Sequence, residues 1–129
     1  MEIGGLITRA VLTVEETDSL RDAALGMMER GVGSAVVLAE DRPVGVITDR
    51  EALRAIAQDL DANFTPVKKF LARNPTTVTG DVELVEAARL MRDRGFRHLI
   101  VVNGDGALEG VFSMRDLVVG LLQERPDAD

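Results

Sequence analysis

The chain has 129 residues and a mass of 13.9 kDa, a length that suits one small domain or two small halves that fold as one. Its 15 basic and 22 acidic side chains give a net charge of −7 at pH 7, which argues against a duplex nucleic-acid binder, because such a protein needs a basic face. The sequence has no cysteine, which excludes disulfides and thiolate chemistry, and its one histidine, His98, is the only histidine available to a catalytic or metal site.

The first half of the chain predicts a strand, a helix, two strands and a second helix. Residues 11–14 form a short β-type run, and the apolar residues of 20–28 follow helical spacing up to Gly31, which suits a helix end. Apolar strands over residues 35–38 and 44–47 flank a hairpin turn at residues 40–42. The second helix is expected from Asp49 to about Asp59, and residues 61–66 are interpreted as a linker.

The second half predicts the same order of elements. A strand at residues 76–78 precedes a helix whose apolar residues run from Leu84 to Met91 and which ends near Gly95. Strands follow at residues 99–102 and 108–112, joined by a turn at residues 104–106. The last helix is expected from Met114 to about Gln123, and residues 125–129 form an acidic tail.

The two halves are copies of one unit. An offset of 64 positions keeps identical residues in register, and one extra residue in the second hairpin changes it to 65: Arg9/Arg73, Ala23/Ala87, Met27/Met91, Gly31/Gly95, Gly45/Gly110 and Arg50/Arg115. We therefore expect an α/β fold of tandem β-α-β-β-α repeats at residues 1–62 and 63–124. Because each half alone is near the smallest size for a stable core and its strands are apolar on both faces, the two sheets should pack together as one pseudo-two-fold module.

The segment before each last helix carries the strongest chemical signal. It reads Gly-apolar-apolar-Thr/Ser-x-Arg-Glu/Asp over residues 45–51 and again over residues 110–116. A hydroxyl at a helix N-terminus lies beside free N–H groups and the positive end of the helix dipole, which suits a phosphate. A carboxylate three residues later can accept hydrogen bonds from a ribose diol, the arginine adds positive charge, and the glycine lets a ligand or another backbone approach.

An alternative interpretation needs no ligand. Ser/Thr-x-x-Glu at a helix start is a capping box, and Thr48 with Glu51 fits that rule. The paired recurrence of the glycine and the arginine favours a ligand site, because capping requires neither of them.

These features together resemble a pair of CBS (cystathionine β-synthase) domains, over residues 6–123. Residues 73–78 and 95–102 add to the resemblance. It implies that the two repeats bind adenosine-containing nucleotides in clefts between them, with the Thr/Ser at phosphate or ribose and the Asp at the ribose hydroxyls. The pattern carries over fully to Gly110, Ser113 and Asp116, whereas the first repeat has Glu51 in place of the aspartate. The candidate ligand residues are Gly45, Thr48, Arg50 and Glu51 in the first repeat and Gly110, Ser113, Arg115 and Asp116 in the second.

Four further residues are candidates. Arg97 and His98 begin the middle strand of the second repeat, where family members often face phosphate; a histidine satisfied by a backbone carbonyl is the alternative. Thr13 and Thr77, ahead of the first helices, either bond an adenine or close a local turn. Residues 1–66 carry 6 basic and 12 acidic side chains and residues 67–129 carry 9 and 10, so we expect the better phosphate site in the second repeat.

The resemblance implies a stand-alone sensor of AMP, ADP, ATP or a related adenosyl compound, which passes ligand occupancy to an effector protein of unknown identity. We expect no enzyme activity, required cofactor, metal or nucleic-acid partner; the alternative is a ligand-free dimerisation or protein-interaction module. Small and flexible apolar residues on several helix faces predict a homodimer. The first six residues do not resemble a signal peptide and the apolar runs are far below the ~20 residues of a membrane span, so we expect a cytoplasmic protein with no membrane partner.

Overall fold

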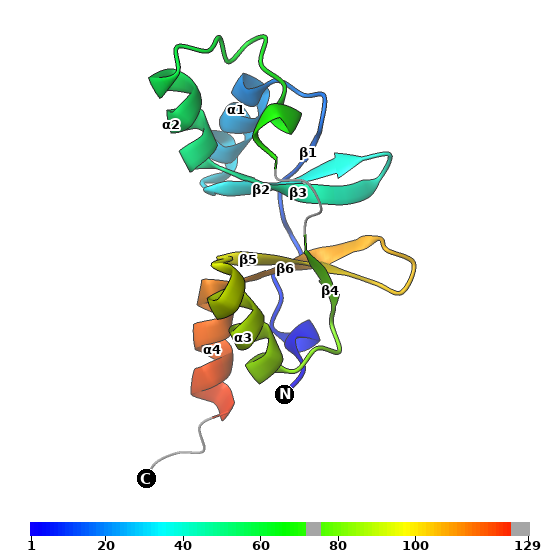
Figure 1. The fold of residues 1–129 in the computed structure, drawn as a ribbon. Coiled ribbons are helices and arrows are strands. Elements are labelled where there is room, and N and C mark those ends of the chain that lie inside the picture. The colour runs from blue at the N-terminus through cyan, green and yellow to red at the C-terminus, as the bar shows by residue number, and fades with distance from the viewer. Residues whose placement is uncertain (72–75, 125–129) are drawn as a thin grey trace. The chain divides into compact units, whose positions relative to one another are not determined.

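The computed structural model describes residues 1–71 and 76–124, which form two compact units (Figure 1). We call residues 11–71 the first-repeat unit, and residues 1–10 together with residues 76–124 the second-repeat unit. The predicted acidic tail and residues 73–75 of the supporting segment lie outside the described residues. In the described part of the chain, no helix is long and apolar enough to cross a membrane.

The first-repeat unit is a three-stranded sheet with two helices on one face (Figure 1). Its elements are β1 (Thr13–Glu15), α1 (Leu20–Arg30), β2 (Ser34–Ala39), β3 (Arg42–Thr48), α2 (Asp49–Ala57) and a 3-10 turn, η2 (Val67–Phe70). Strand β1 runs parallel to β2, and β2 runs antiparallel to β3. Helix α1 begins where the Ser19 hydroxyl accepts a hydrogen bond from the Asp22 N–H, and it ends at Gly31, whose φ of 65° confirms the predicted left-handed residue.

The second-repeat unit has the same topology, with sheet order β4-β5-β6. Its elements are a 3-10 turn, η1 (Ile3–Gly5), β4 (Thr77–Thr79), α3 (Leu84–Arg94), β5 (His98–Val102), β6 (Leu108–Ser113) and α4 (Met114–Glu124). The predicted tandem β-α-β-β-α order is therefore confirmed. One helix is shorter than expected: α2 ends at Ala57, because Asp59 takes a left-handed conformation with φ 56° and the chain turns there.

Each unit has its own apolar core between its sheet and its helices. In the first-repeat unit, Val37 and Ile47 of the sheet pack with Met27 of α1. In the second-repeat unit, Val101 and Phe112 pack with Met91 of α3. Strand residues alternate between faces, so the neighbours of these core residues place apolar side chains on the opposite face of each sheet as well. The continuous apolar runs in the sequence predicted apolar side chains on both faces of each sheet.

Each unit also contains the short segment that precedes the other repeat. Ile3 is fully buried in the core of the second-repeat unit, where its N–H donates to the Val82 carbonyl at 2.9 Å. Val67, which is 64 positions later, is fully buried in the core of the first-repeat unit, where its N–H donates to the Asp18 carbonyl at 2.9 Å. The predicted linker is thus part of a core, because Thr65 is buried as well and its carbonyl accepts from the Leu20 N–H.

This reciprocal arrangement means that the compact units are not cut at the boundaries of the sequence repeats. The segments 1–10 and 61–71 each supply apolar side chains to the unit that the other repeat builds. The repeat boundaries at residues 62 and 63, and the packing of the two sheets against each other, stay predictions.

Candidate functional site

The start of α4 brings Ser113 and Asp116 together. Strand β6 ends at Ser113, and one turn into α4 a single carboxylate oxygen of Asp116, Oδ2, accepts hydrogen bonds from the Ser113 N–H at 2.8 Å and the Ser113 hydroxyl at 3.0 Å. The Asp116 N–H lies 3.2 Å from the Ser113 hydroxyl oxygen, to which it donates. The pair therefore caps the helix, as the alternative interpretation of the motif required, and it uses only one oxygen of the carboxylate.

Thr8 lies beside the other oxygen of that carboxylate. Its hydroxyl is 3.5 Å from Asp116 Oδ1, although the two residues are 108 positions apart in the chain. The Thr8 backbone forms a bridge to Val111 of β6 through two hydrogen bonds of 2.9 Å. The sequence analysis did not identify Thr8 as a site residue. Thr8 belongs to residues 1–10, and nothing in the motif at residues 110–116 indicates that this distant segment packs beside it.

The glycine of the second-repeat motif lies against another backbone segment. A Cβ atom on Gly110 would lie 2.4 Å from the Thr8 carbonyl oxygen, so only glycine permits the bridge between Thr8 and Val111. The equivalent Cβ on Gly45 would lie 3.0 Å from a methyl group of Leu71. Of the two roles that the sequence left open for this glycine, close approach of the backbone is the one observed for Gly110.

His98 faces the same capped turn from the neighbouring strand. It is the first residue of β5 and is paired with Ser113 across the sheet. Burial lowers the pKa of the half-buried His98 imidazole below its ordinary value, and Arg97 acts in the same direction while the Asp116 carboxylate opposes it. The ring is therefore mainly neutral at pH 7, with one nitrogen that donates and one that accepts hydrogen bonds.

Arg97 links this turn to a pocket on the helix side of the same unit. Its carbonyl accepts a hydrogen bond from the Met114 N–H at 3.1 Å, and its side chain is exposed. The pocket has a volume of about 520 Å³ and lies between the C-terminal end of α3 and the start of α4. Its lining residues are Ala88, Met91, Arg92, Gly95, Phe96, Arg97, Met114 and Leu117.

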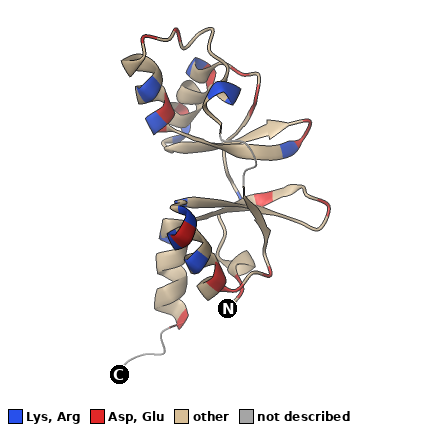
Figure 2. Ribbon diagram, viewed as in Figure 1, with Lys and Arg blue, Asp and Glu red and all other residues tan. Residues whose placement is uncertain are grey.

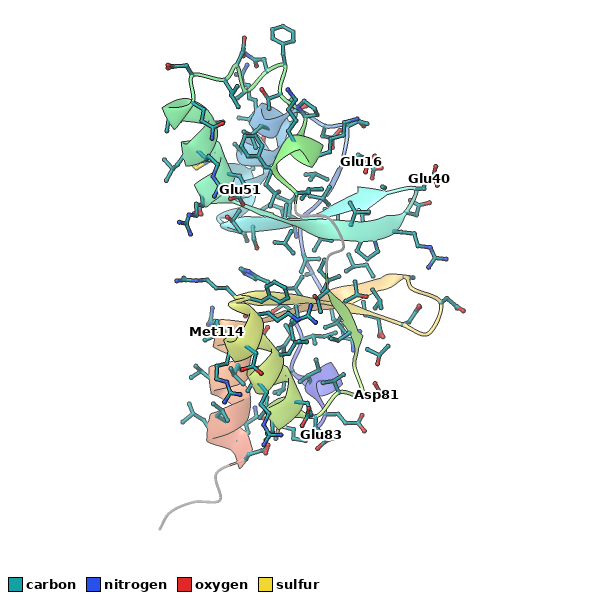
Figure 3. The ribbon with its side chains drawn as sticks, in the orientation of Figure 1. Glu16, Glu40, Glu51, Asp81, Glu83 and Met114 are labelled. Atoms are coloured by element: carbon teal, nitrogen blue, oxygen red, sulfur yellow. The ribbon has the colours of Figure 1, made fainter. Side chains whose placement is uncertain are left out.

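The first repeat builds the equivalent turn with different charges. Glu51 Oε1 accepts from the Thr48 N–H at 2.9 Å and from the Thr48 hydroxyl at 2.8 Å. The first of these bonds, together with the Thr48 side chain accepting from the Glu51 backbone, forms a capping box. At the position of Met114 the first repeat has Asp49, whose N–H donates to the Gly33 carbonyl at 3.0 Å. A carboxylate oxygen of Asp49 lies 3.2 Å from the point that a Cβ on Gly33 would occupy. Figure 3 labels Glu51 in the first turn of α2 and Met114 at the start of α4.

The other predicted residues lie farther from these interactions. Thr13 and Thr77 are exposed on β1 and β4, paired with Val36 and Ile100 respectively. Arg50 and Arg115 are exposed in the first turns of α2 and α4. Within the described residues, no hydrogen bond or ion pair joins Thr77 or Arg115 to the Ser113–Asp116 pair. The same part of the chain holds no group of three or more acidic or histidine side chains that could bind a metal ion.

Comparison with known proteins assigns the family. A model of the CBS domain matches the chain twice, over residues 3–58 and 67–122. The chain belongs to the CBS-domain family. The two matched ranges begin at Ile3 and Val67, which are buried residues of the segments 1–10 and 61–71. Each match therefore includes a segment that packs into the unit built by the other repeat.

Three similar proteins illustrate the relationship. A CBS domain protein of Pyrobaculum aerophilum, solved in complex with AMP, has a TM-score of 0.83 and 33% identity over 95% of this chain and 99% of its own. The CBS-pair protein CBSX2 of Arabidopsis thaliana, also solved with AMP, has a TM-score of 0.78 and 25% identity over 97% of this chain and 98% of its own. An uncharacterized 17.7 kDa protein of Acidianus ambivalens is 35% identical over 94% of this chain and 73% of its own length.

Other relatives are longer proteins. The chain spans 61% of a Methanopyrus kandleri relative and 19% of an Arabidopsis thaliana CBS domain-containing relative. Fold and family are therefore shared with proteins of different overall size.

Proposed function

We propose that this chain is a cytoplasmic regulatory module that binds AMP, ADP, ATP or a related adenosine compound at the start of α4. The observation that carries the proposal is the state of the Asp116 carboxylate. Its Oδ2 atom caps the helix through two hydrogen bonds from Ser113, while within the described residues Oδ1 has only the 3.5 Å contact with the Thr8 hydroxyl and can accept from a ribose diol. The AMP complexes of the two similar structures support the same ligand class.

The surrounding groups suit such a ligand. The N–H groups in the first turn of α4 and the Ser113 hydroxyl favour a phosphate at the helix N-terminus, and the exposed Arg97 adds positive charge. A neutral His98 can donate a hydrogen bond to a phosphate oxygen, and the incoming negative charge raises its pKa again. Thr13, Thr77 and Arg115 remain candidate contacts that need a bound ligand to test.

The second repeat is the better anion site in this proposal. In the first repeat, Asp49 stands at the position of Met114 and Gly33 at that of Arg97. The first repeat therefore has an additional negative charge and lacks the positive charge of Arg97, and both differences disfavour an anionic ligand. Thr48 and Arg50 suit a phosphate, and Thr48 holds one oxygen of Glu51 just as Ser113 holds one oxygen of Asp116, so the preference rests on the neighbouring charges and on the longer side chain of Glu51. We expect one nucleotide per chain, at Ser113 and Asp116.

The test compares Asp116→Ala with Glu51→Ala by titration calorimetry with AMP and by thermal melting. Each variant removes a carboxylate from the first turn of a helix, so both should lose about 0.3–1 kcal/mol of stability. Only Asp116→Ala should also weaken AMP binding, by roughly 10- to 150-fold, since a charged hydrogen bond is worth ~1.5–3 kcal/mol. Equal affinity changes in the two variants, or no AMP binding by the wild-type chain, would sink the proposal and leave the ligand-free interaction module.

The proposed output is a change in an effector protein that binds the loaded and empty forms differently. The family is one of regulatory modules, and a site made of a capped helix start and a neutral imidazole supplies ligand contacts rather than a nucleophile and base. Incubation with ATP, followed by nucleotide chromatography, should recover the ATP unchanged. Release of ADP or AMP would contradict the regulatory assignment.

A homodimer is part of the proposal. Helix α2 turns Leu53 and Ile56 outward at 67% and 72% exposure, and α4 turns Leu121 and Leu122 outward at 50% and 69%. Most of α4 carries no charge (Figure 2). A second copy that covers these faces would remove the apolar surface from water. Light scattering should give about twice 13.9 kDa, and Leu122→Asp should return the monomer mass; a wild-type monomer at micromolar concentration would contradict this.

A further inference from the structure

The pocket beside Arg97 combines an apolar floor with two arginines in its lining. Its floor is apolar, since Met91 and Leu117 are 3% and 8% exposed, and Phe96 is half-buried. Two arginines complete the lining: Arg92, which is paired with Asp93 at 2.8 Å, and Arg97. A pocket of about 520 Å³ with an apolar wall and few charged groups has the size and character of a small-molecule site.

The equivalent positions of the first repeat show which lining residues the fold itself requires. The lining recurs only in part in the first repeat: Ala24, Met27 and Gly31 stand for Ala88, Met91 and Gly95, whereas the smaller Val32 and Ala52 stand for Phe96 and Leu117. The charged lining does not recur, because Met28 and Gly33 replace the two arginines and Asp49 replaces Met114. Since the first repeat forms the same helices and strands without these arginines, the fold has no need of them.

The pocket adjoins the proposed nucleotide site. Met114 lies between them: it lines the pocket, follows Ser113 directly in the chain, and its N–H is bonded to the carbonyl of Arg97, a second lining residue. A phosphate held at the Ser113 hydroxyl would therefore lie at the edge of the pocket that Arg97 lines. Any group attached to that phosphate and directed toward α3 would meet the apolar floor.

We infer that the pocket accepts an apolar group attached to the phosphate of the bound nucleotide, so that the ligand is an adenosine 5′-phosphate ester or anhydride with an apolar substituent. Arg97 holds the single negative charge of the bridging phosphate, and the side chains of Met91, Phe96 and Leu117 pack against the substituent. This inference rests on the proposed function, because it takes Ser113 as the phosphate site.

The test uses two esters of AMP that carry the same charge. The methyl ester and the octyl ester are both phosphodiesters with one negative charge, and they differ only in the apolar chain. In titration calorimetry with the full chain, the octyl ester should bind at least tenfold more tightly than the methyl ester. Equal affinities for the two esters overturn the inference. Binding of AMP with no gain from the octyl chain leaves the proposed function standing, whereas failure of all three ligands to bind overturns both.

Two variants and a matched control test whether the octyl chain binds in this pocket. Ala88→Phe fills the pocket and should reduce the octyl preference to less than about threefold, while Ala24→Phe makes the same change at the equivalent position of the first repeat and should preserve it. Met114→Asp, at a site that is 46% exposed, leaves the core intact and should also lower the preference by placing an acid on the pocket rim. An unchanged octyl preference in both Ala88→Phe and Met114→Asp would overturn the assignment to this pocket.

Discussion

Replacing Gly110 by alanine tests how the second-repeat unit is held together. The new Cβ would lie 2.4 Å from the Thr8 carbonyl oxygen, a backbone atom that can move away only if the bridge between Thr8 and Val111 opens. Two backbone hydrogen bonds are then lost at about 0.5–1.5 kcal/mol each. Ile7, whose side chain is 3.1 Å from the same point, must also shift out of its contact with the core. We expect Gly110→Ala to lower the free energy of unfolding by about 2–4 kcal/mol.

Gly45→Ala is the matched control in the first repeat. Its Cβ would lie 3.0 Å from a methyl group of Leu71, a flexible side chain that can turn away, so the loss should stay below about 1 kcal/mol. The assay is urea unfolding followed by far-UV circular dichroism, since the chain has no tryptophan to report by fluorescence. The reasoning is refuted if Gly110→Ala is as stable as the wild type. It is equally refuted if that variant loses AMP affinity without loss of stability, because the glycine would then serve the ligand.

Three further predictions follow from burial and charge. Gly120→Ala in α4 places a Cβ 2.7 Å from a methyl group of Leu6, so the variant should melt at a lower temperature than the wild type. This is expected although alanine is favoured over glycine in a helix by ~1 kcal/mol. Ile3→Ala should cost about 2–5 kcal/mol in urea unfolding because Ile3 is fully buried, whereas a loss near zero would mean that residues 1–10 do not pack as described. Burial lowers the pKa of His98 from 6.5, so the unfolded chain binds a proton more readily; stability is complete above pH 6.5 and falls as the pH drops below it. In the His98→Gln variant, the free energy of unfolding measured with urea should fall less between about pH 7 and pH 5 than in the wild type. An unchanged dependence on pH would contradict a lowered pKa for His98.

At the capped turn of Ser113, the helix cap is compatible with the proposed ligand role. Capping requires one acceptor oxygen, and Asp116 supplies it through Oδ2 while Oδ1 lies 3.5 Å from the Thr8 hydroxyl. In the first repeat, a single oxygen of Glu51 accepts both hydrogen bonds from Thr48. The two motifs read alike in the sequence and form the same hydrogen bonds. The neighbouring residues differ in charge, with Arg97 and Met114 in the second repeat and Gly33 and Asp49 in the first, and the proposed preference for the second repeat depends on this difference.

The sequence alone determined the local structure of this protein. Helical and alternating apolar periodicities depend on the residues within one element, and Gly31 and Gly95 mark helix ends through their own backbone preference. The internal repeat then required the second half to follow the first. The capping boxes could also be predicted, since Ser113 and Asp116 are only three positions apart and meet within one helical turn.

Only the tertiary structure decided which distant segments complete each unit. The burial of Ile3 and Val67 depends on contacts with residues far along the chain, and no periodicity in a short segment records which core it enters. The same applies to Thr8, which reaches Asp116 from 108 positions away, and to the pocket, whose walls come from α3, α4 and residues 95–97 between α3 and β5. Local propensities act over a few residues, whereas these features arise from close packing between elements that the chain brings together only on folding.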